Sequence, residues 1–508
     1  MGRTGLSSHD KKYILAIDEG TSSLRAILFD EEMHIIGKTQ YGITQYTPSA
    51  DRVEHDPDEI WQKQLAAMKE TIGKSGVNPS NIASIGITNQ RETVVIWDKG
   101  TGRALYRAIV WQDRRGSAYT EWLKIHYSDT VKKKTGLIPD PYFSASKIKW
   151  LLENKPGLYK KAKTGNLLFG TIDSWLIWNL TGGKVHATDH TNASRTMLYN
   201  IEKMEWDADL LELFRIPHSI LPDVNASSAE YGYTAGHFFG TEIPITGVIG
   251  DQQAALYGEL AHKRGEVKCT YGTGNFVLVS TGSDIVRAKN LLTTIAWSSP
   301  GRITYALEGS IFITGAAVQW LRDGIGIINN YKDLEIMAKR VNSSEGLYFV
   351  PALTGMGTPY WDPYARGVLI GITRRTTREH IARAVIESEA YLTKEVIDLI
   401  EMELGTDIKS LKVDGGGSEN DTLMQFQADI LNKDLIKPAV IETTSMGAAF
   451  VAGITTGYWN NEREMASTWR AGKEFHPSMS NEERGRLYNG WKEAVKRSLK
   501  WGSIVEPV

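Results

Sequence analysis

Two short turns rich in glycine and hydroxyl side chains constrain the fold of this chain more than any other feature of its sequence. The first turn, DEGTSS at residues 18–23, joins the apolar, β-branched stretches 13–17 and 24–29. The second turn, YGTG at residues 271–274, lies between two similar stretches. Each pattern predicts a β-hairpin whose tip turns backbone N–H groups and hydroxyls toward an anion. Together they predict one phosphate-binding device that is built twice.

The length of the chain predicts two domains. Its 508 residues exceed what one hydrophobic core usually serves, and 41% of them are hydrophobic, which is enough to fill two cores. Since each hairpin opens one half of the chain, we expect an N-terminal domain over residues 13–257 and a C-terminal domain over residues 258–508. The segment 1–12 is polar and lacks an apolar signal core, so it is predicted to be a flexible leader.

Strand and helix signals that alternate in both halves predict α/β sheets covered by helices. In the first half, Asp56 and Pro57 mark the start of a helix, and the apolar strand 82–87 runs toward Arg91 and Glu92. Ligands of open α/β sheets gather beyond the carboxyl ends of the strands, where this pair would lie. A neighbouring Arg and Glu are more often solvated surface, so the pair alone does not define a site.

The second half repeats this plan. A long helix is predicted from about Thr376 to Leu404, with Thr376 and Glu379 forming a capping box at its start. The strand that follows ends in the glycine-rich turn 415–417, and a further helix starts at Asn420. A glycine-rich turn between a strand and a helix lets a charged ligand rest against bare backbone.

Composition argues against several kinds of partner. The formal net charge is -2 and no block of Lys and Arg is longer than residues 132–134, so no electrostatic footprint for nucleic acid or a lipid surface is visible. No apolar run approaches the length of a membrane span. The single cysteine, Cys269, lies in a predicted strand, which favours a packed small side chain and a reducing, cytoplasmic setting.

Eight ordered segments resemble the FGGY carbohydrate kinases, and most closely those members that phosphorylate glycerol. The segments are DEGTSSLR (18–25), NQRET (89–93), IVWQDRR (109–115), DPYFSASKIKWLL (140–152), GDQQAAL (250–256), YGTGNF (271–276), GTPYWDPYARG (357–367) and the DGGG turn with LMQFQADIL behind it. The resemblance implies an α/β fold of two actin-like (ribonuclease-H-like) ATPase domains with a cleft between them. It also implies ATP-dependent, Mg²⁺-assisted phosphorylation of a glycerol hydroxyl, which gives sn-glycerol 3-phosphate and ADP.

The same resemblance implies roles for individual residues. Asp251 matches the general base that takes the hydroxyl proton. The glycerol-binding residues would be Arg91, Glu92, Trp111, Tyr142, Asp251, Gln252 and Phe276. The nucleotide-binding residues would be Thr21, Ser22, Ser23, Arg25, Thr273, Gly315, Gln319, Gly416, Gly417 and Asn420. Asp18 and Asp251 match the carboxylates that hold Mg²⁺ through water.

Some of these residues also have purely structural explanations. Gly315 could serve the close packing of a helix on a sheet, and Trp111 and Phe276 could be core side chains. The turn 417–419 replaces the small apolar residues that are common there in the family, so contacts to the base are less well specified than contacts to the phosphates.

The stretch 234–240 departs from one regulatory pattern of the family and resembles another. It lacks the Gly-Gly-Lys-Gly type of loop that binds fructose 1,6-bisphosphate, which argues against that form of inhibition. Its HFFG sequence resembles a loop in which a histidine is phosphorylated by a phosphocarrier protein, and this makes His237 a regulatory candidate. A loop histidine is more often simply solvated. The family is commonly dimeric or tetrameric, which implies a homodimer or homotetramer.

Two other functions stay open on the sequence alone. One is an FGGY kinase for another polyol or for a ketose such as xylulose, although the NQRET and VWQDRR stretches favour glycerol. The other is an actin-like or heat-shock-type ATPase switch, which would share both hairpins. Such a switch would not need the Arg91 and Glu92 pair, Tyr142, or the Asp251 and Gln252 pair.

Overall fold

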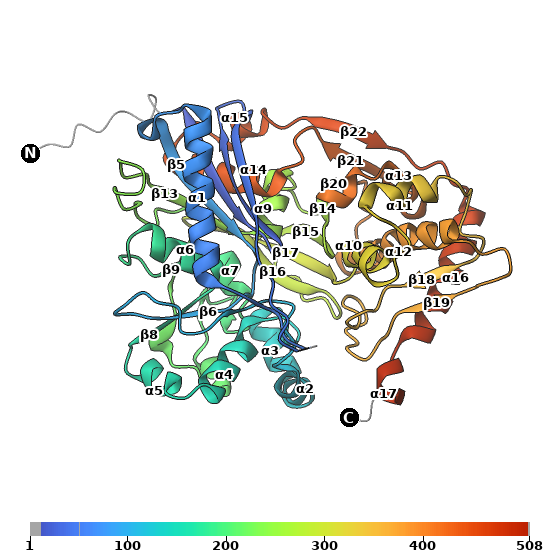
Figure 1. Ribbon diagram of the computed structural model, residues 1–508, viewed down its shortest axis with the longest axis horizontal. Coiled ribbons are helices and arrows are strands. Elements are labelled where there is room, and N and C mark those ends of the chain that lie inside the picture. The colour runs from blue at the N-terminus through green and yellow to red at the C-terminus, as the bar shows by residue number, and fades with distance from the viewer. Residues whose placement is uncertain (1–11, 50, 506–508) are drawn as a thin grey trace, which may run out of the picture.

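Two lobes, each built around one β-sheet, lie side by side in the computed structural model (Figure 1). The structure describes residues 12–49 and 51–505. The predicted flexible leader therefore lies outside the described residues, apart from Lys12. The backbone N–H of Lys12 donates to the Asn81 carbonyl over 3.1 Å.

The first sheet contains the first predicted hairpin. Its strands, in spatial order, are β13 (Ile245–Gly250), β5 (Ile82–Asn89), β1 (Tyr13–Glu19), β2 (Ser23–Phe29) and β3 (Ile35–Gly42). β1, β2 and β3 are antiparallel, whereas β5 and β13 run parallel to β1. The hairpin register pairs Asp18 with Arg25, so the turn between them carries the glycine and hydroxyl residues.

The second sheet contains the second predicted hairpin. Its strands, in spatial order, are β16 (Leu292–Ser299), β17 (Arg302–Ile311), β15 (Asn275–Gly282), β14 (Val267–Tyr271), β20 (Ser410–Asp414), β21 (Asp434–Pro438) and β22 (Ala471–Phe475). β14, β15 and β17 are antiparallel, and β20 and β21 run parallel to β14. The order β17-β15-β14-β20-β21 therefore repeats the order β3-β2-β1-β5-β13. This repeat confirms the prediction of one α/β unit built twice.

The helices α1 (Pro57–Ser75) and α12 (Arg378–Leu404) occupy equivalent places, because each connects the third strand of its unit to the fourth. α1 begins as predicted: the Asp56 carboxylate accepts hydrogen bonds from the N–H groups of the first turn. The predicted capping box of α12 was wrong by one residue. Thr377 is the cap, and its N–H donates to Nδ1 of His380 over 3.2 Å. Glu379 instead pairs with the neighbouring Arg378 at 3.1 Å.

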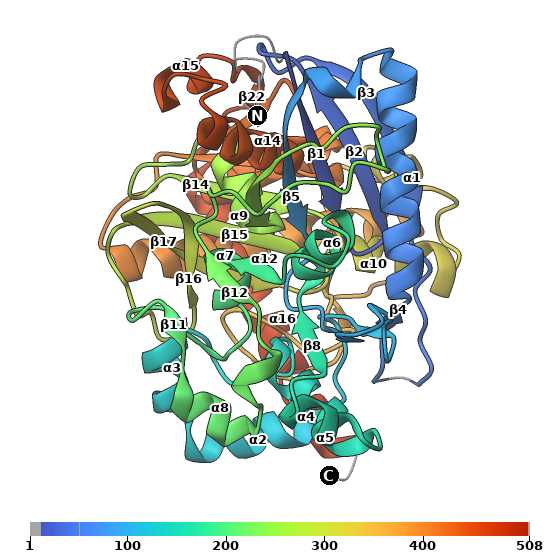
Figure 2. The same ribbon diagram turned by 90° about the vertical axis from the view of Figure 1, so that its left-hand side faces the viewer.

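Two helices, α9 (Asp251–Gly258) and α14 (Thr443–Thr456), cross between the lobes. α14 comes from the C-terminal half but packs on β1, β5 and β13 of the first sheet, while α9 contacts β14 and β15 of the second. Figure 2 shows orange-red α14 beside the blue strands, with α1 on their other side. The helices touch closely at Gly447, where an added Cβ would lie 1.9 Å from the Ala254 carbonyl oxygen. Each lobe thus completes the core of the other.

Alternation along β1 explains how the first sheet is covered on both faces. Ile14 belongs to the core cluster that contains Phe450 of α14, whereas Leu15 belongs to the cluster that contains Met68 of α1. A separate core cluster fills the second lobe, and Cys269 of β14 lies in it, fully buried as predicted. No helix in the described part of the chain is long and apolar enough to cross a membrane.

Shorter elements complete the two lobes. The other helices are α2 (Ser117–His126), α3 (Ser128–Thr135), α4 (Ser144–Asn154), α5 (Leu158–Lys163), α6 (Ile172–Leu180), α7 (His190–Ser194), α8 (Ala208–Phe214), α10 (Gly315–Gln319), α11 (Tyr331–Ala338), α13 (Asp421–Leu431), α15 (Glu462–Ala466), α16 (Asn481–Ser498) and α17 (Trp501–Val505). Small two-stranded sheets pair β4 (Glu54–His55) with β7 (Ala108–Ile109), β6 (Val95–Asp98) with β8 (Leu167–Gly170), β9 (Ala187–Asp189) with β12 (Asp223–Asn225), β10 (Tyr199–Asn200) with β11 (Glu205–Trp206), and β18 (Tyr348–Val350) with β19 (Val368–Ile370).

Candidate active site

A cavity of about 320 Å³ lies between the two hairpins and collects most of the predicted site residues. Among its lining residues are Thr21, Ser22, Ser23, Arg25, Arg91, Glu92, Trp111, Tyr142, Asp251, Gln252, Thr273, Phe276 and Gly416. All seven side chains predicted to bind glycerol are therefore present in one cavity. They reach it from separate parts of the chain, because the carboxyl ends of parallel strands share one edge of a sheet.

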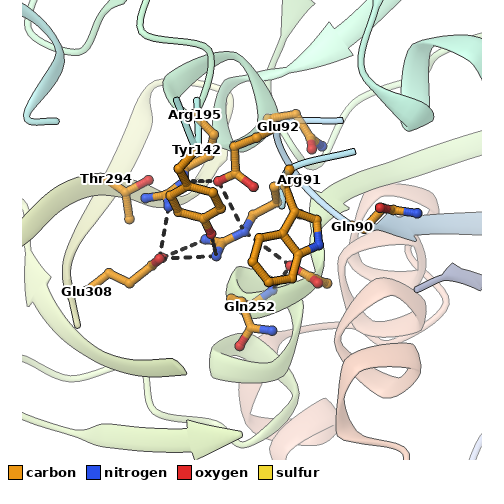
Figure 3. A network of polar contacts seen from close by, with 12 residues as sticks. Gln90, Arg91, Glu92, Tyr142, Arg195, Gln252, Thr294 and Glu308 are labelled. Atoms are coloured by element: carbon orange, nitrogen blue, oxygen red, sulfur yellow. Dashed lines mark hydrogen bonds and ion pairs between the residues drawn. The ribbon is translucent and has the colours of Figure 1, made fainter. Parts of the chain in front are cut away.

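A buried network of charged side chains forms one wall of this cavity (Figure 3). Arg91, just beyond β5, donates to both carboxylate oxygens of Glu308 on β17, over 2.6 and 3.1 Å. Arg195, which follows α7, donates to Glu92 over 2.6 Å and to Glu308 over 2.9 Å. The predicted pair is thus not solvated surface: Arg91 is 2% exposed and Glu92 is 1% exposed. The network ties the first lobe to a strand of the second.

The acids of this network differ in their electrostatics. Burial alone would raise the pKa of Glu308, but Arg195 and Arg91 outweigh it and hold this pKa at about 2. For Glu92, burial outweighs the attraction of Arg195 and Arg91, so its pKa is raised. Glu92 also has a φ of 61°, in the left-handed region that few non-glycine residues adopt. Its contacts therefore hold it in a costly backbone conformation at the edge of the cavity.

Asp251 is the first residue of α9 and directly follows β13. Its side chain is 24% exposed, and its Oδ1 lies 3.1 Å from Nε of Arg91. Burial raises the pKa of Asp251, and Arg91 opposes this rise only in part. The neighbouring Gln252 accepts a hydrogen bond from the buried ammonium group of Lys268. A carboxylate with a raised pKa that faces a cavity is suited to accept a proton.

Aromatic rings form the apolar side of the cavity. The ring of Trp111 lies 5.6 Å from that of Tyr142 and 6.1 Å from that of Phe276, both in edge-to-face contact. Nε1–H of Trp111 donates to Oγ1 of Thr21 over 2.8 Å, so this wall is also bonded to the first hairpin. The Arg91 guanidinium lies 5.8 Å from the centre of the Phe276 ring. The cavity thus combines fixed polar groups with an aromatic wall.

Charged groups also surround the first hairpin. Arg25 on β2 donates to Glu442 over 2.9 Å, and its Nε lies 3.7 Å from Asp18 on β1. Ser445 of α14 donates to Asp18 over 3.2 Å. Burial raises the pKa of Asp18, more than Arg25 lowers it. Asp18 is thus a buried carboxylate whose charge its neighbours only partly offset.

A second cavity of about 700 Å³ lies beside the second hairpin. Its lining residues include the predicted Thr273, Gly315, Gly416, Gly417 and Asn420, together with side chains of α11 and α12. An added Cβ on Gly315 would lie 2.4 Å from the Gly272 carbonyl, so this glycine is needed for close packing as well. Asn420 caps α13 through a hydrogen bond from Leu423 N–H. Gln319 is exposed and does not line the cavity.

Sequence reasoning missed several residues of the site. Glu308, Arg195 and Gln253 all bond to the predicted pair, with Gln253 accepting from Arg91 over 3.1 Å, and Glu442 bonds to Arg25. One signal was present for Glu308, since it is the charged residue within the strand segment 303–311, whose other residues are uncharged. Arg195 and Glu442 lie in stretches with no local pattern that marks them.

The fold and the cleft together define a class of protein. Two lobes of repeated topology each present a glycine-containing hairpin to one cavity, beside a carboxylate and a small polar pocket. This is the arrangement of a kinase with the actin-like ATPase fold that phosphorylates a small acceptor.

The chain belongs to the FGGY family of carbohydrate kinases. The model of the family's N-terminal domain matches residues 13–258, and the model of its C-terminal domain matches residues 267–456.

Similar proteins cover nearly the whole chain. "Glycerol kinase 2" of Sulfolobus acidocaldarius is 56% identical over 495 residues, which is 97% of this chain and 99% of the relative. "Glycerol kinase 2" of Saccharolobus solfataricus is 57% identical over 490 residues, or 96% of this chain and 98% of the relative. The crystal structure of Plasmodium falciparum glycerol kinase with ADP is 36% identical and superposes with a TM-score of 0.87, covering 96% of this chain and 98% of that one.

Proposed function

We propose that this protein is a glycerol kinase, which transfers the γ-phosphoryl group of ATP to a terminal hydroxyl of glycerol and so performs the first step of glycerol catabolism. One observation carries the proposal: the seven predicted acceptor-binding side chains line a single cavity between the two hairpins. The relatives at 56% and 57% identity, which are named for this activity, support the same substrate.

The acceptor pocket can orient a small triol through groups that are already fixed. Arg91 donates and Glu92 accepts, and the ion pairs to Glu308 and Arg195 hold both side chains in place. The carbon edge of the triol would lie against the rings of Trp111 and Phe276. Such fixed donors and acceptors align a hydroxyl for attack without further ordering cost.

Asp251 would take the proton of the attacking hydroxyl. It lies at the cavity, and its raised pKa brings it nearer to the pH at which a general base works best. Arg91, at 3.1 Å, favours the ionised form of the carboxylate and fixes its position. The triphosphate would lie between the two hairpins, with Thr21, Ser22 and Ser23 on one side and Thr273 on the other.

We also propose Mg²⁺ as the cofactor, held through water by Asp18 and Asp251. Their carboxylates repel each other, and burial raises both pKa values, so a nearby divalent cation would relieve an unfavourable charge. When bound, the ion would neutralise charge on the phosphates during transfer.

A coupled assay of ADP formation across a panel of polyols and ketoses tests the proposed function. Glycerol should support the highest kcat/KM, above xylulose and other acceptors. A pocket of buried polar groups can reject an analogue that lacks a hydroxyl by ~10⁴–10⁵-fold, so 1,2-propanediol should be a very poor substrate. Equal specificity constants for glycerol and this diol would contradict the proposal. ATP hydrolysis that does not depend on any acceptor would favour the ATPase switch instead.

We also propose His237 as a site of regulation. His237 is exposed in a turn that is anchored by Phe238, whose ring packs on Trp61 of α1 at 5.4 Å. This exposure supports modification of His237 by a phosphocarrier protein, which mass spectrometry after incubation with that protein would test.

From the family resemblance we propose a homodimer or homotetramer, to be measured by sedimentation. A cytoplasmic setting stays a prediction from the sequence.

A further inference from the structure

One carboxyl group in the nucleotide-side cavity has no partner among the residues that the structure describes. Glu389 lies on α12, is 5% exposed and lines the cavity of about 700 Å³. Within residues 12–49 and 51–505, its side chain makes no hydrogen bond and no ion pair. A buried polar group without a partner costs free energy. A ligand bound in this cavity could therefore supply the missing hydrogen-bond partner of Glu389.

The surroundings of Glu389 do not supply such a group. Val318, Leu334, Ile386 and Leu423 give the cavity an apolar lining. Besides Thr273 of the second hairpin and Asn420, whose side-chain oxygen caps α13, the polar and charged groups that line this space are Tyr271 of β14, Tyr331, Lys332 and Glu335 of α11, and Glu419 before α13. Tyr271 donates to Gln427 instead, and Glu335 pairs with Lys339 at 2.7 Å.

Burial without a partner favours the uncharged form of this side chain. It raises the pKa of Glu389 to about 8, with no charged neighbour to offset the rise. A neutral carboxylic acid offers one O–H donor and one C=O acceptor, side by side. That pattern complements the edge of adenine, which presents the N6 amino donor next to a ring-nitrogen acceptor.

The position of the cavity also fits a nucleoside. Gly272 and Thr273 of the second hairpin line both cavities, as does Gly416. A nucleotide whose phosphates lie at the hairpins would therefore extend its base toward α11 and α12. We propose that Glu389 hydrogen-bonds the amino edge of the base and thereby makes the cavity selective for adenine nucleotides. This inference rests on the proposed use of ATP.

A thermodynamic cycle tests the inference. The dissociation constants of ADP and of purine riboside 5′-diphosphate, which lacks the 6-amino group, are measured by calorimetry on the full chain and on two variants. The unaltered protein should prefer ADP by about 5- to 150-fold, the range of a good bidentate contact to a base. Glu389→Leu should bind the two ligands within about twofold of each other, since it has no group to read the amine. Glu389→Gln should keep the preference, because a carboxamide also offers a donor and an acceptor.

The matched control is Glu335→Gln, which changes a carboxylate of the same cavity that already has a partner. It should leave the ADP preference unchanged. Glu389→Leu should also unfold no earlier than the unaltered protein on heating, because it removes an unpaired polar group from an apolar site.

Two results would overturn the inference. One is an unchanged ADP preference in Glu389→Leu, and the other is loss of that preference in Glu389→Gln with ADP still bound. Failure of the proposed function would look different: no glycerol-dependent ADP would form in the unaltered protein, whatever its base preference.

Discussion

The two cavities of the cleft differ in the residues that line them. The cavity of about 320 Å³ is the proposed acceptor end, and the cavity of about 700 Å³ is the proposed nucleotide end. The acceptor end combines an aromatic wall with charged side chains from both lobes that are locked by ion pairs, as in the contacts of Arg91 and Arg195 with Glu308. The nucleotide end is lined by glycine backbone, apolar side chains and polar side chains from α11 and α12, around a larger space. The difference suggests that acceptor recognition depends on side chains locked by ion pairs, whereas nucleotide recognition depends on close backbone approach, shape and the side chain of Glu389. Changes at the two ends should therefore fail in different ways.

The largest effect should come from Asp251→Asn. The amide cannot accept the hydroxyl proton, so kcat should fall by ~10²–10⁴-fold. Binding of ATP and glycerol should stay within a few-fold, because the side chain keeps its size. Steady-state kinetics and calorimetry measure the two quantities separately. A near-normal turnover rate would remove Asp251 from the mechanism.

Removing Glu308 should cost stability as well as activity. Glu308→Ala leaves two buried guanidinium groups without their shared carboxylate, and breaking such a pair costs about 3–5 kcal/mol of unfolding free energy. Denaturant titration measures it. The matched change at the nucleotide end, Glu335→Ala, breaks a partly exposed pair and should cost at most about 1 kcal/mol. Similar losses of unfolding free energy in both variants would contradict the proposed difference between the two ends.

Thr273→Ala should weaken the nucleotide end alone. The backbone carbonyl of Thr273 accepts from the N–H groups of Thr314 and Ala316 at 3.1 and 3.0 Å, so the turn should keep its shape. Loss of one hydroxyl contact to a charged phosphate costs about 1.5–3 kcal/mol, which is roughly a 10- to 150-fold rise in KM for ATP. The KM for glycerol should not change. A rise in both constants would show that the two ends are coupled.

The pH dependence of kcat/KM should follow the ionisation of Asp251 at the acceptor end. Asp251 must be ionised to take a proton, so kcat/KM should fall about tenfold for each pH unit below its pKa. Since burial raises this pKa, the decline should begin above the ordinary aspartate value of about 3.9. Glu308, held near a pKa of about 2, should stay ionised throughout. A pH–rate profile whose acid limb lies at or below the ordinary value would contradict the assignment of Asp251.

Local patterns in the sequence predicted the parts of the fold that depend on neighbouring residues. The hairpin turns and the Asp56 cap are read from a few consecutive residues, and both are confirmed. Glu308 was not predicted as a partner of Arg91, because 217 residues separate the two in the chain. The predicted capping box was wrong by one residue because Thr377 caps the helix, which places His380 and not Glu379 at the third helical position. Which side chains pair across the two lobes depends on the topology of the fold. The hydrophobic periodicity of the sequence carries no information about it.

The exchange of α9 and α14 has a consequence for biosynthesis. As the chain leaves the ribosome, β1, β5 and β13 can pair before α14 exists, so one apolar face of the sheet stays open to water. It can close only after residue 456 has emerged, when Gly447 can settle against Ala254. The N-terminal half of the nascent chain therefore cannot complete its hydrophobic core until α14 has been synthesised.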